Sequence, residues 1–160
     1  MEPLPPCSDM ENALNAYGSM LWRLGLSMMR NPADTEDAIQ ETMLKYFRKS
    51  PTFENSEHEK AWLIRVHANT CRDMLRKKKR RPEAAESSVP ETAAPRETNV
   101  MEALGQLPEK LRLVMMLHYA EGYSVNEIAS IIRRTPSAVK MRLKKGRGML
   151  EEILKKEGLL

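Results

Sequence analysis

Residues 124–150 read SVNEIASIIRRTPSAVKMRLKKGRGML, and this stretch decides the fold that we expect. Ser124 and Glu127 have the spacing of a capping box, in which the serine caps a helix and the glutamate reaches back to the serine amide. Thr135 before Pro136 is a helix cap followed by proline at the first helical position. The pattern predicts a short helix, a tight turn and a second helix that enters the DNA major groove, a helix-turn-helix.

The second helix of this motif divides into an apolar and a basic side. Val139, Leu143, Gly146 and Leu150 recur at helical spacing and are expected to face the core. Residues 128–150 contain seven basic and no acidic residues, which favours contact with a polyanion over a merely solvated basic face. The residues of this module that we predict to contact DNA are Ser124, Ser137, Lys140, Met141, Arg142, Lys144, Lys145 and Arg147.

The composition of the whole chain limits the classes of function. With 160 residues and 41% apolar side chains, it can bury one ordinary core or two small helical ones. The net charge of +4 is unevenly placed, because residues 72–81 hold seven basic residues against one acid. The two cysteines show no metal-ligand spacing, and we find no apolar run of about 20 residues and no signal-peptide pattern. We therefore expect a cytoplasmic protein that uses no metal or cofactor.

Helical periodicity without strand-like alternation predicts an all-α protein of two small domains. Residues 82–100 are rich in Pro, Ala, Ser, Thr and Glu, and we predict that they form a flexible linker between a module at 12–81 and a module at 101–160. The predicted helices span residues 17–29, 34–49, 57–80, 101–107, 108–119, 124–132 and 136–156.

Residues 31–49, NPADTEDAIQETMLKYFRK, predict an amphipathic helix with an unusual polar face. We expect four side chains to point inward: Ile39, Met43, Tyr46 and Phe47. The opposite face carries Asp37, Gln40, Glu41, Leu44 and Arg48. An acidic and polar surface suits a protein partner better than DNA. The alternative interpretation is that this face contacts only solvent and that its acids stabilise the helix through the helix dipole.

Residues 61–81, AWLIRVHANTCRDMLRKKKRR, predict a third helix whose exposed face is basic. Ile64, Ala68, Cys71 and Leu75 are expected to form its apolar stripe. Arg65, Asn69, Arg72 and Arg76 lie away from that stripe and can track nucleic acid. Trp62 is either a stacking platform for a base or a core residue.

These segments resemble bacterial sigma factors. Residues 104–150 closely resemble sigma region 4, and residues 31–49 with 61–81 resemble sigma region 2. With no further sigma region evident, the chain is identified as an extracytoplasmic-function (ECF) sigma factor. Gly25, Met43, Gly146 and Gly148 depart from the usual family residues, and the two later glycines are expected to loosen the last helix.

The resemblance implies a subunit without enzymatic activity that directs core RNA polymerase to promoters and helps open the minus-ten region. It implies that Asp37, Gln40, Glu41 and Leu44 contact the clamp helices of the largest polymerase subunit, and that the flap of the second-largest subunit is a further partner. The implied minus-ten contacts are Asn55, Trp62, Arg65, Asn69, Arg72 and Arg76, with residues 51–59 holding a flipped base. Region 4 would bind the minus-thirty-five duplex, and an anti-sigma factor, often membrane-bound, would hold the protein inactive.

Two other classes of function remain as alternatives. A conventional helix-turn-helix regulator would bind duplex DNA without polymerase and use the N-terminal helices for dimerisation or sensing. The polar face with Asp37 argues against it, because a dimer seam prefers apolar residues. An enzyme is disfavoured, since His58, His67 and His118 have no evident nucleophile partner and are expected at the surface or in helix packing.

Overall fold

The computed structural model describes residues 6–49, 51–80 and 95–159, and the chain divides into two compact units, Met1–Ser87 and Ser88–Leu160. Every regular element among the described residues is a helix, which confirms the all-α prediction. Most of the segment predicted as a linker, residues 82–94, lies outside the described residues.

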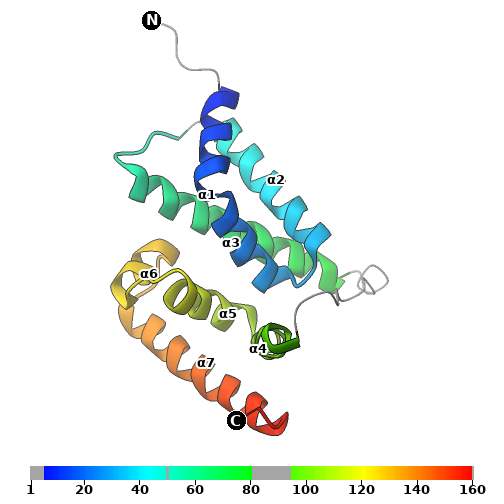
Figure 1. Ribbon diagram of the computed structural model, residues 1–160. Helices are drawn as coiled ribbons and strands as arrows, with labels where there is room; N and C mark the ends of the chain where they lie inside the picture. The colour runs from blue at the N-terminus through cyan, green and yellow to red at the C-terminus, as the bar shows by residue number, and fades with distance from the viewer. Residues whose placement is uncertain (1–5, 50, 81–94, 160) are drawn as a thin grey trace, which may run out of the picture. The chain divides into compact units, whose positions relative to one another are not determined.

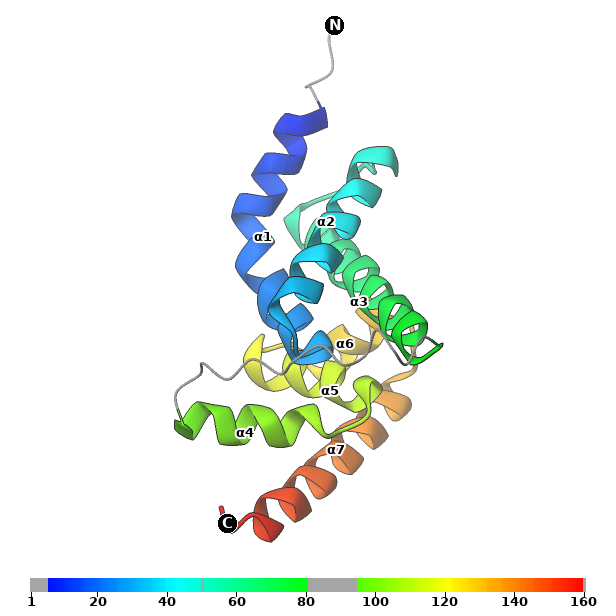
Figure 2. The same ribbon diagram turned by 90° about the vertical axis from the view of Figure 1, so that its right-hand side faces the viewer.

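The first unit is built from three long helices. They are α1 (Pro6–Met29), α2 (Pro32–Lys49) and α3 (Ser56–Arg80), so α1 begins well before the predicted start at residue 17. α1 and α2 form an antiparallel hairpin on which α3 packs (Figures 1 and 2). Arg30 ends α1 in the left-handed conformation, with φ at 57°, and the Asn31 side chain accepts the Asp34 N–H at 2.9 Å. The left-handed residue that ends α1 and the cap that begins α2 together allow the chain to reverse direction between the two helices.

The core of this unit encloses a histidine. His67 is fully buried, and its Nε2 lies 2.8 Å from the Leu21 carbonyl oxygen, which can only accept, so Nε2 carries the proton. Nδ1 then faces the Thr42 hydroxyl at 3.1 Å. Burial lowers the pKa of His67 from 6.5 to about 4, because the charged imidazolium would lose its hydration. His67 is thus a neutral helix-packing residue.

The second unit contains α4 (Pro95–Gly105), α5 (Glu109–Met115), the π-helical turn η2 (Met116–Ala120), α6 (Val125–Ile132) and α7 (Pro136–Lys156). α4 begins at Pro95, so residues 95–100 are helical although they were predicted as linker. Proline suits a first helical turn because its φ is already set and its missing N–H has no partner there. α7 packs against α4, α5 and α6 (Figure 2).

Arg112 and Gly146 are buried where segments of the second unit meet. The Arg112 guanidinium is buried and donates from one terminal nitrogen to the carbonyl oxygens of Gly105 at 3.0 Å and Leu107 at 2.5 Å, at the turn between α4 and α5. Gly146 is buried, and a Cβ there would lie 3.1 Å from the Met115 side chain. α7 continues through Gly146 and Gly148, so neither glycine interrupts the last helix.

Candidate nucleic-acid and protein interfaces

The exposed face of α2 is a mixed polar and apolar stripe. Asp37, Gln40 and Leu44 are exposed, as predicted, and Phe47 joins them with 45% of its surface exposed. The prediction that Phe47 points inward was wrong. At about 100° per residue, positions 37, 40, 44 and 47 follow one another down the same side of a helix. That spacing was present in the sequence and could have placed Phe47 correctly. We call these four residues the α2 stripe.

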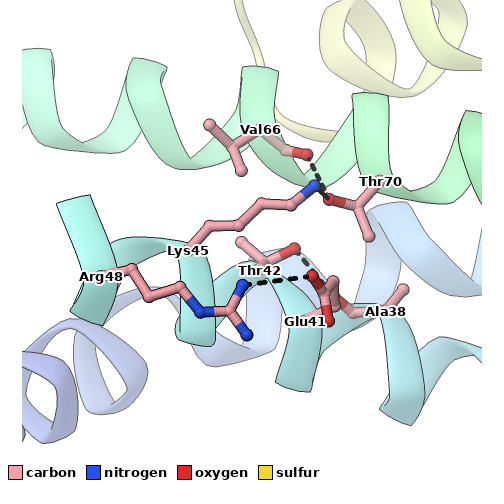
Figure 3. Close-up of polar contacts among 7 residues, drawn as sticks. All are labelled: Ala38, Glu41, Thr42, Lys45, Arg48, Val66 and Thr70. Atoms are coloured by element: carbon pink, nitrogen blue, oxygen red, sulfur yellow. Dashed lines mark hydrogen bonds and ion pairs between the residues drawn. The ribbon is translucent and has the colours of Figure 1, made fainter.

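Other polar residues of α2 make contacts within the unit (Figure 3). Glu41 lies 3.9 Å from Arg48, an exposed ion pair at the edge of the α2 stripe. Lys45 turns toward α3 and donates to the Thr70 hydroxyl at 2.9 Å. The lysine therefore joins two helices, while Glu41 keeps close to half of its side-chain surface in solvent.

The residues of α3 predicted to contact the minus-ten strand share one side of the helix. Positions 62, 65, 69, 72 and 76 follow one another at steps of three and four residues. Asn69 and Arg76 are exposed, while Arg65 and Arg72 are half-buried. Arg72 donates to the Asn69 side-chain oxygen at 3.2 Å, and Arg76 lies 3.8 Å from Asp73. The structure thus brings these side chains together as one continuous polar stripe, which we call the α3 stripe.

An aromatic cluster lies at the start of the α3 stripe. Trp62 is half-buried, with its ring centroid 5.8 Å from Tyr46 and 5.9 Å from Phe53. The Tyr46 hydroxyl donates to Glu59 at 2.7 Å, which ties α2 to the first turn of α3. Trp62 is therefore neither a pure core residue nor a free platform, because one part packs and another reaches solvent.

Asn55 caps the N-terminus of α3, a role that was not predicted from the sequence. Its side-chain oxygen accepts the His58 N–H at 2.8 Å, and its carbonyl accepts the Glu59 N–H at 3.2 Å. These are the bonds of a helix cap at the beginning of α3. The Asn55 side chain is otherwise exposed.

The basic end of α3 is divided between packing and solvent. Lys78 forms an ion pair with Asp34 of α2, and both side chains are largely covered. Lys77, Lys79 and Arg80 are exposed. In the basic run at the end of α3, Lys78 therefore packs against α2, whereas its basic neighbours Lys77, Lys79 and Arg80 face solvent.

The helix-turn-helix has the predicted caps. The Ser124 hydroxyl accepts the Glu127 N–H at 3.1 Å, and the Ser124 N–H donates to the Glu127 carboxylate at 2.8 Å. Arg133 closes α6 with a left-handed φ of 59°, and the Thr135 hydroxyl accepts the Ala138 N–H at 3.1 Å. These local features thus fix where α6 begins and ends and where α7 begins.

The exposed side of α7 is basic, as predicted. Val139, Leu143 and Gly146 are buried. The exposed residues of the predicted DNA face are Ser137, Lys140, Met141, Lys144 and Lys145, and Arg142 is half-buried. This arrangement places several cations and one apolar side chain on the exposed side of a single helix.

Arg147 is exposed and lies on the same side of α7 as Lys140 and Lys144, one turn further along the helix. It donates to the Tyr119 hydroxyl at 3.1 Å and lines an apolar groove of about 480 Å³ in the second unit. The groove is lined mainly by apolar side chains from three segments. They are Val100, Met101 and Leu104 of α4; Met115 at the end of α5 with Met116, Tyr119 and Ala120 of η2; and Leu150 and Leu154 of α7. The groove could not be predicted from the sequence, because its walls come from separate helices.

In the part of the chain that the structure describes, no cluster of His, Cys, Asp and Glu side chains is suited to a metal ion. No described helix is both long and apolar enough to cross a membrane.

The fold and these faces define a two-module transcription protein with a helix-turn-helix. Residues 13–81 match the family Sigma-70 region 2, and residues 97–150 match Sigma-70 region 4. The chain belongs to the sigma-70 family, in its ECF class. It is an RNA polymerase sigma factor that directs core polymerase to promoters, and this assignment does not support the conventional regulator.

Relatives from distant bacteria align over most of their length. The chain is 31% identical to the RNA polymerase sigma factor CarQ of Myxococcus xanthus, over 79% of this chain and 78% of CarQ. It is 32% identical to the ECF sigma factor SigM of Mycobacterium tuberculosis, over 84% of this chain and 71% of SigM. The sigma factor SigV of Bacillus subtilis is 29% identical, over 86% of each chain.

Solved structures share this fold, among them the following two. The sigma factor RpoE of Bartonella quintana, in complex with the anti-sigma factor NepR, gives a TM-score of 0.75 at 24% identity, covering 92% of this chain and 97% of RpoE. CnrH, in complex with the cytosolic domain of CnrY, gives a TM-score of 0.69 at 24% identity, covering 92% of this chain and 88% of CnrH.

Proposed function

We propose that three faces of this sigma factor divide the work of promoter recognition: the α2 stripe, the α3 stripe and the exposed side of α7. Polymerase supplies the covalent chemistry, so this chain is not itself an enzyme and acts in the cytoplasm beside the chromosome. The observation that carries the proposal is the separation of charge between faces, because α2 exposes an acid with apolar side chains whereas α3 and α7 expose cations.

The α2 stripe binds the clamp helices of the largest polymerase subunit. Leu44 and Phe47 are 44% and 45% exposed, and Asp37 and Gln40 continue the line. Apolar side chains beside hydrogen-bonding ones are what a protein interface uses. Glu41 contributes from the edge of the stripe, where Arg48 partly balances its charge.

The α3 stripe captures the unpaired minus-ten strand. Arg65, Asn69, Arg72 and Arg76 supply cations and amide groups along one side of α3. A base that leaves the stack packs on the exposed part of Trp62. Asn55, which caps the start of α3, is near Trp62 in the sequence. Base stacking on an aromatic ring contributes about 1–3 kcal/mol, so Trp62 is the residue of this stripe with the largest expected effect on affinity.

The exposed side of α7 reads the minus-thirty-five duplex through Ser137, Lys140, Met141, Lys144 and Lys145. Arg142 of α7 and Ser124, which caps α6, complete the proposed contacts. Phosphate contacts by the lysines position the helix, whereas specificity comes from contacts to base edges. Arg147 extends this group by one turn, and its guanidinium keeps N–H donors besides the nitrogen that bonds Tyr119.

The apolar groove of the second unit takes a segment of the flap of the second-largest polymerase subunit. Its lining is apolar apart from Arg147 and Glu151, and Val100 and Met101 are left exposed at it. An amphipathic helix buries its apolar face in such a groove.

We also propose that an anti-sigma factor, of a membrane-bound or a soluble kind, covers these faces until a signal releases it. The sigma factor RpoE, which shares this fold, was solved with the anti-sigma factor NepR. An anti-sigma factor bound to the α2 stripe would compete with core polymerase for Leu44 and Phe47.

Run-off transcription from a library of genomic fragments tests the function. Core polymerase with this protein is expected to produce transcripts that core polymerase alone does not. The variant Asp37→Arg with Leu44→Ala is expected to lose them, together with binding to core polymerase. Glu152→Arg, the same charge reversal at an exposed residue of α7, is the control and should leave core binding intact. Specific duplex binding without any protein-dependent transcript would contradict the proposal.

A further inference from the structure

Met141 has an exposure that neither packing nor the cationic contacts of α7 explain. With 69% of its surface exposed, it is the most exposed large apolar side chain in the described part of the chain. Its neighbours on the helix surface at steps of three and four residues include Ser137, Lys144 and Lys145, all of them exposed. The apolar groove lies elsewhere, and Met141 is not among its lining residues. Met141 is therefore an isolated apolar group surrounded by cations.

This surrounding decides which kind of partner fits. The centre of a protein interface is depleted of lysine and enriched in clustered apolar and aromatic side chains. Here no other large exposed apolar side chain of α7 accompanies Met141 within residues 136–156. The matching surface must be strongly anionic and yet carry a small apolar spot at its centre. The major groove of DNA meets both conditions, since phosphates border it and the 5-methyl group of thymine projects into it.

We propose that Met141 contacts the 5-methyl group of one thymine in the minus-thirty-five duplex and so sets the preference of this sigma factor for an A·T pair at that position. The inference rests on the proposed binding of that duplex by α7. The flexible thioether of methionine can follow the methyl group, and Lys140, Lys144 and Lys145 hold the helix against the phosphates. Burying one methyl group contributes about 0.8 kcal/mol, so the expected preference for thymine over uracil is about fourfold.

Replacing thymine by uracil tests this directly, because uracil lacks only the methyl group. A promoter recovered by run-off transcription is rebuilt with a randomised minus-thirty-five segment, synthesised once with thymine and once with uracil. Polymerase carrying the wild-type protein is expected to select thymine at one position from the first library. From the second library, the preference at that position should fall by about fourfold. Equal preferences from both libraries would overturn the proposal.

Three variants assign the effect to Met141. Met141→Ala should lose the thymine preference at that one position, and its selections from the two libraries should agree. Met141→Leu, which stays apolar, should retain the preference. Lys144→Ala should weaken binding to all sequences and leave the preference unchanged. If Met141→Ala instead weakens binding to core polymerase and leaves base preference intact, Met141 belongs to a protein interface and the proposal is wrong. Failure to recover any promoter would overturn the proposed function itself.

Discussion

The Nε2 atom of His67 lies 2.9 Å from the place that a Cβ atom of residue 25 would occupy, and Gly25 is what leaves room for it. The same Cβ would lie 2.8 Å from the Thr35 side chain. Both distances are shorter than van der Waals contact allows, so α1 approaches α2 and α3 at a point where only glycine fits. The buried histidine thus explains why glycine stands at position 25.

Gly25→Ala is expected to lower the free energy of unfolding by about 1–3 kcal/mol, because the added methyl group must push His67 or Thr35 from its place. Urea unfolding followed by circular dichroism measures this. Gly18→Ala in the same helix is the matched control, since a Cβ there would meet only Leu14 at an ordinary 3.6 Å. That variant should gain roughly 0.5–1 kcal/mol from helix propensity. Equal stability of the two variants would refute the packing argument.

The buried imidazole should make the first unit sensitive to acid. The pKa of His67 is about 4 in the folded protein, below its ordinary 6.5, because burial disfavours the charged ring. As the pH falls below 6.5 the unfolded chain binds the proton first, so stability is lost between pH 6.5 and 4. The full loss is on the order of 3 kcal/mol.

NMR titration of the His67 ring and urea unfolding at several pH values check this prediction. His67→Gln, which keeps a donor toward the Leu21 carbonyl, should flatten the pH dependence of stability in that range. His67 titrating near its ordinary value would show that the ring is not held neutral by burial.

Arg112→Ala is expected to destabilise the second unit by about 2–4 kcal/mol. The substitution leaves the carbonyl oxygens of Gly105 and Leu107 without this donor and opens a cavity at the turn between α4 and α5. Thermal unfolding measures the change, and Lys110→Ala, at an exposed residue of α5, is the control. The loss should also weaken binding to minus-thirty-five duplex at temperatures where the variant begins to unfold. Unchanged stability would contradict the role of Arg112.

Lys78 and Lys79 are neighbours with different expected roles. Lys78→Ala breaks the partly buried ion pair with Asp34 and should cost roughly 1 kcal/mol of stability. Lys79→Ala should leave stability unchanged and weaken binding to promoter DNA, with a smaller dependence of affinity on salt. Unfolding curves and DNA binding at two salt concentrations separate the two effects. The reverse pattern would show that Lys79 packs and Lys78 faces the DNA.

Much of this fold could be predicted because its signals are local. The caps at Ser124 and Thr135 act across three residues, and each is present as its residue pattern predicts. The buried stripes of α3 and α7 follow from helical period alone. The same period puts Phe47 in line with Gln40 and Leu44, so assigning it to the inward face with Met43 and Tyr46 was wrong.

The sequence by itself determined the class of the protein, its helices and which sides of α3 and α7 are polar, because capping bonds and periodicity depend on residues a few positions apart. Only the tertiary structure decided that Lys78 joins Asp34, that Lys45 joins Thr70, and that His67 sits against Gly25. These partners are 44, 25 and 42 residues apart in the sequence. Their contacts depend on how whole helices cross, and that is set by the sum of many packing interactions that no short stretch of sequence contains.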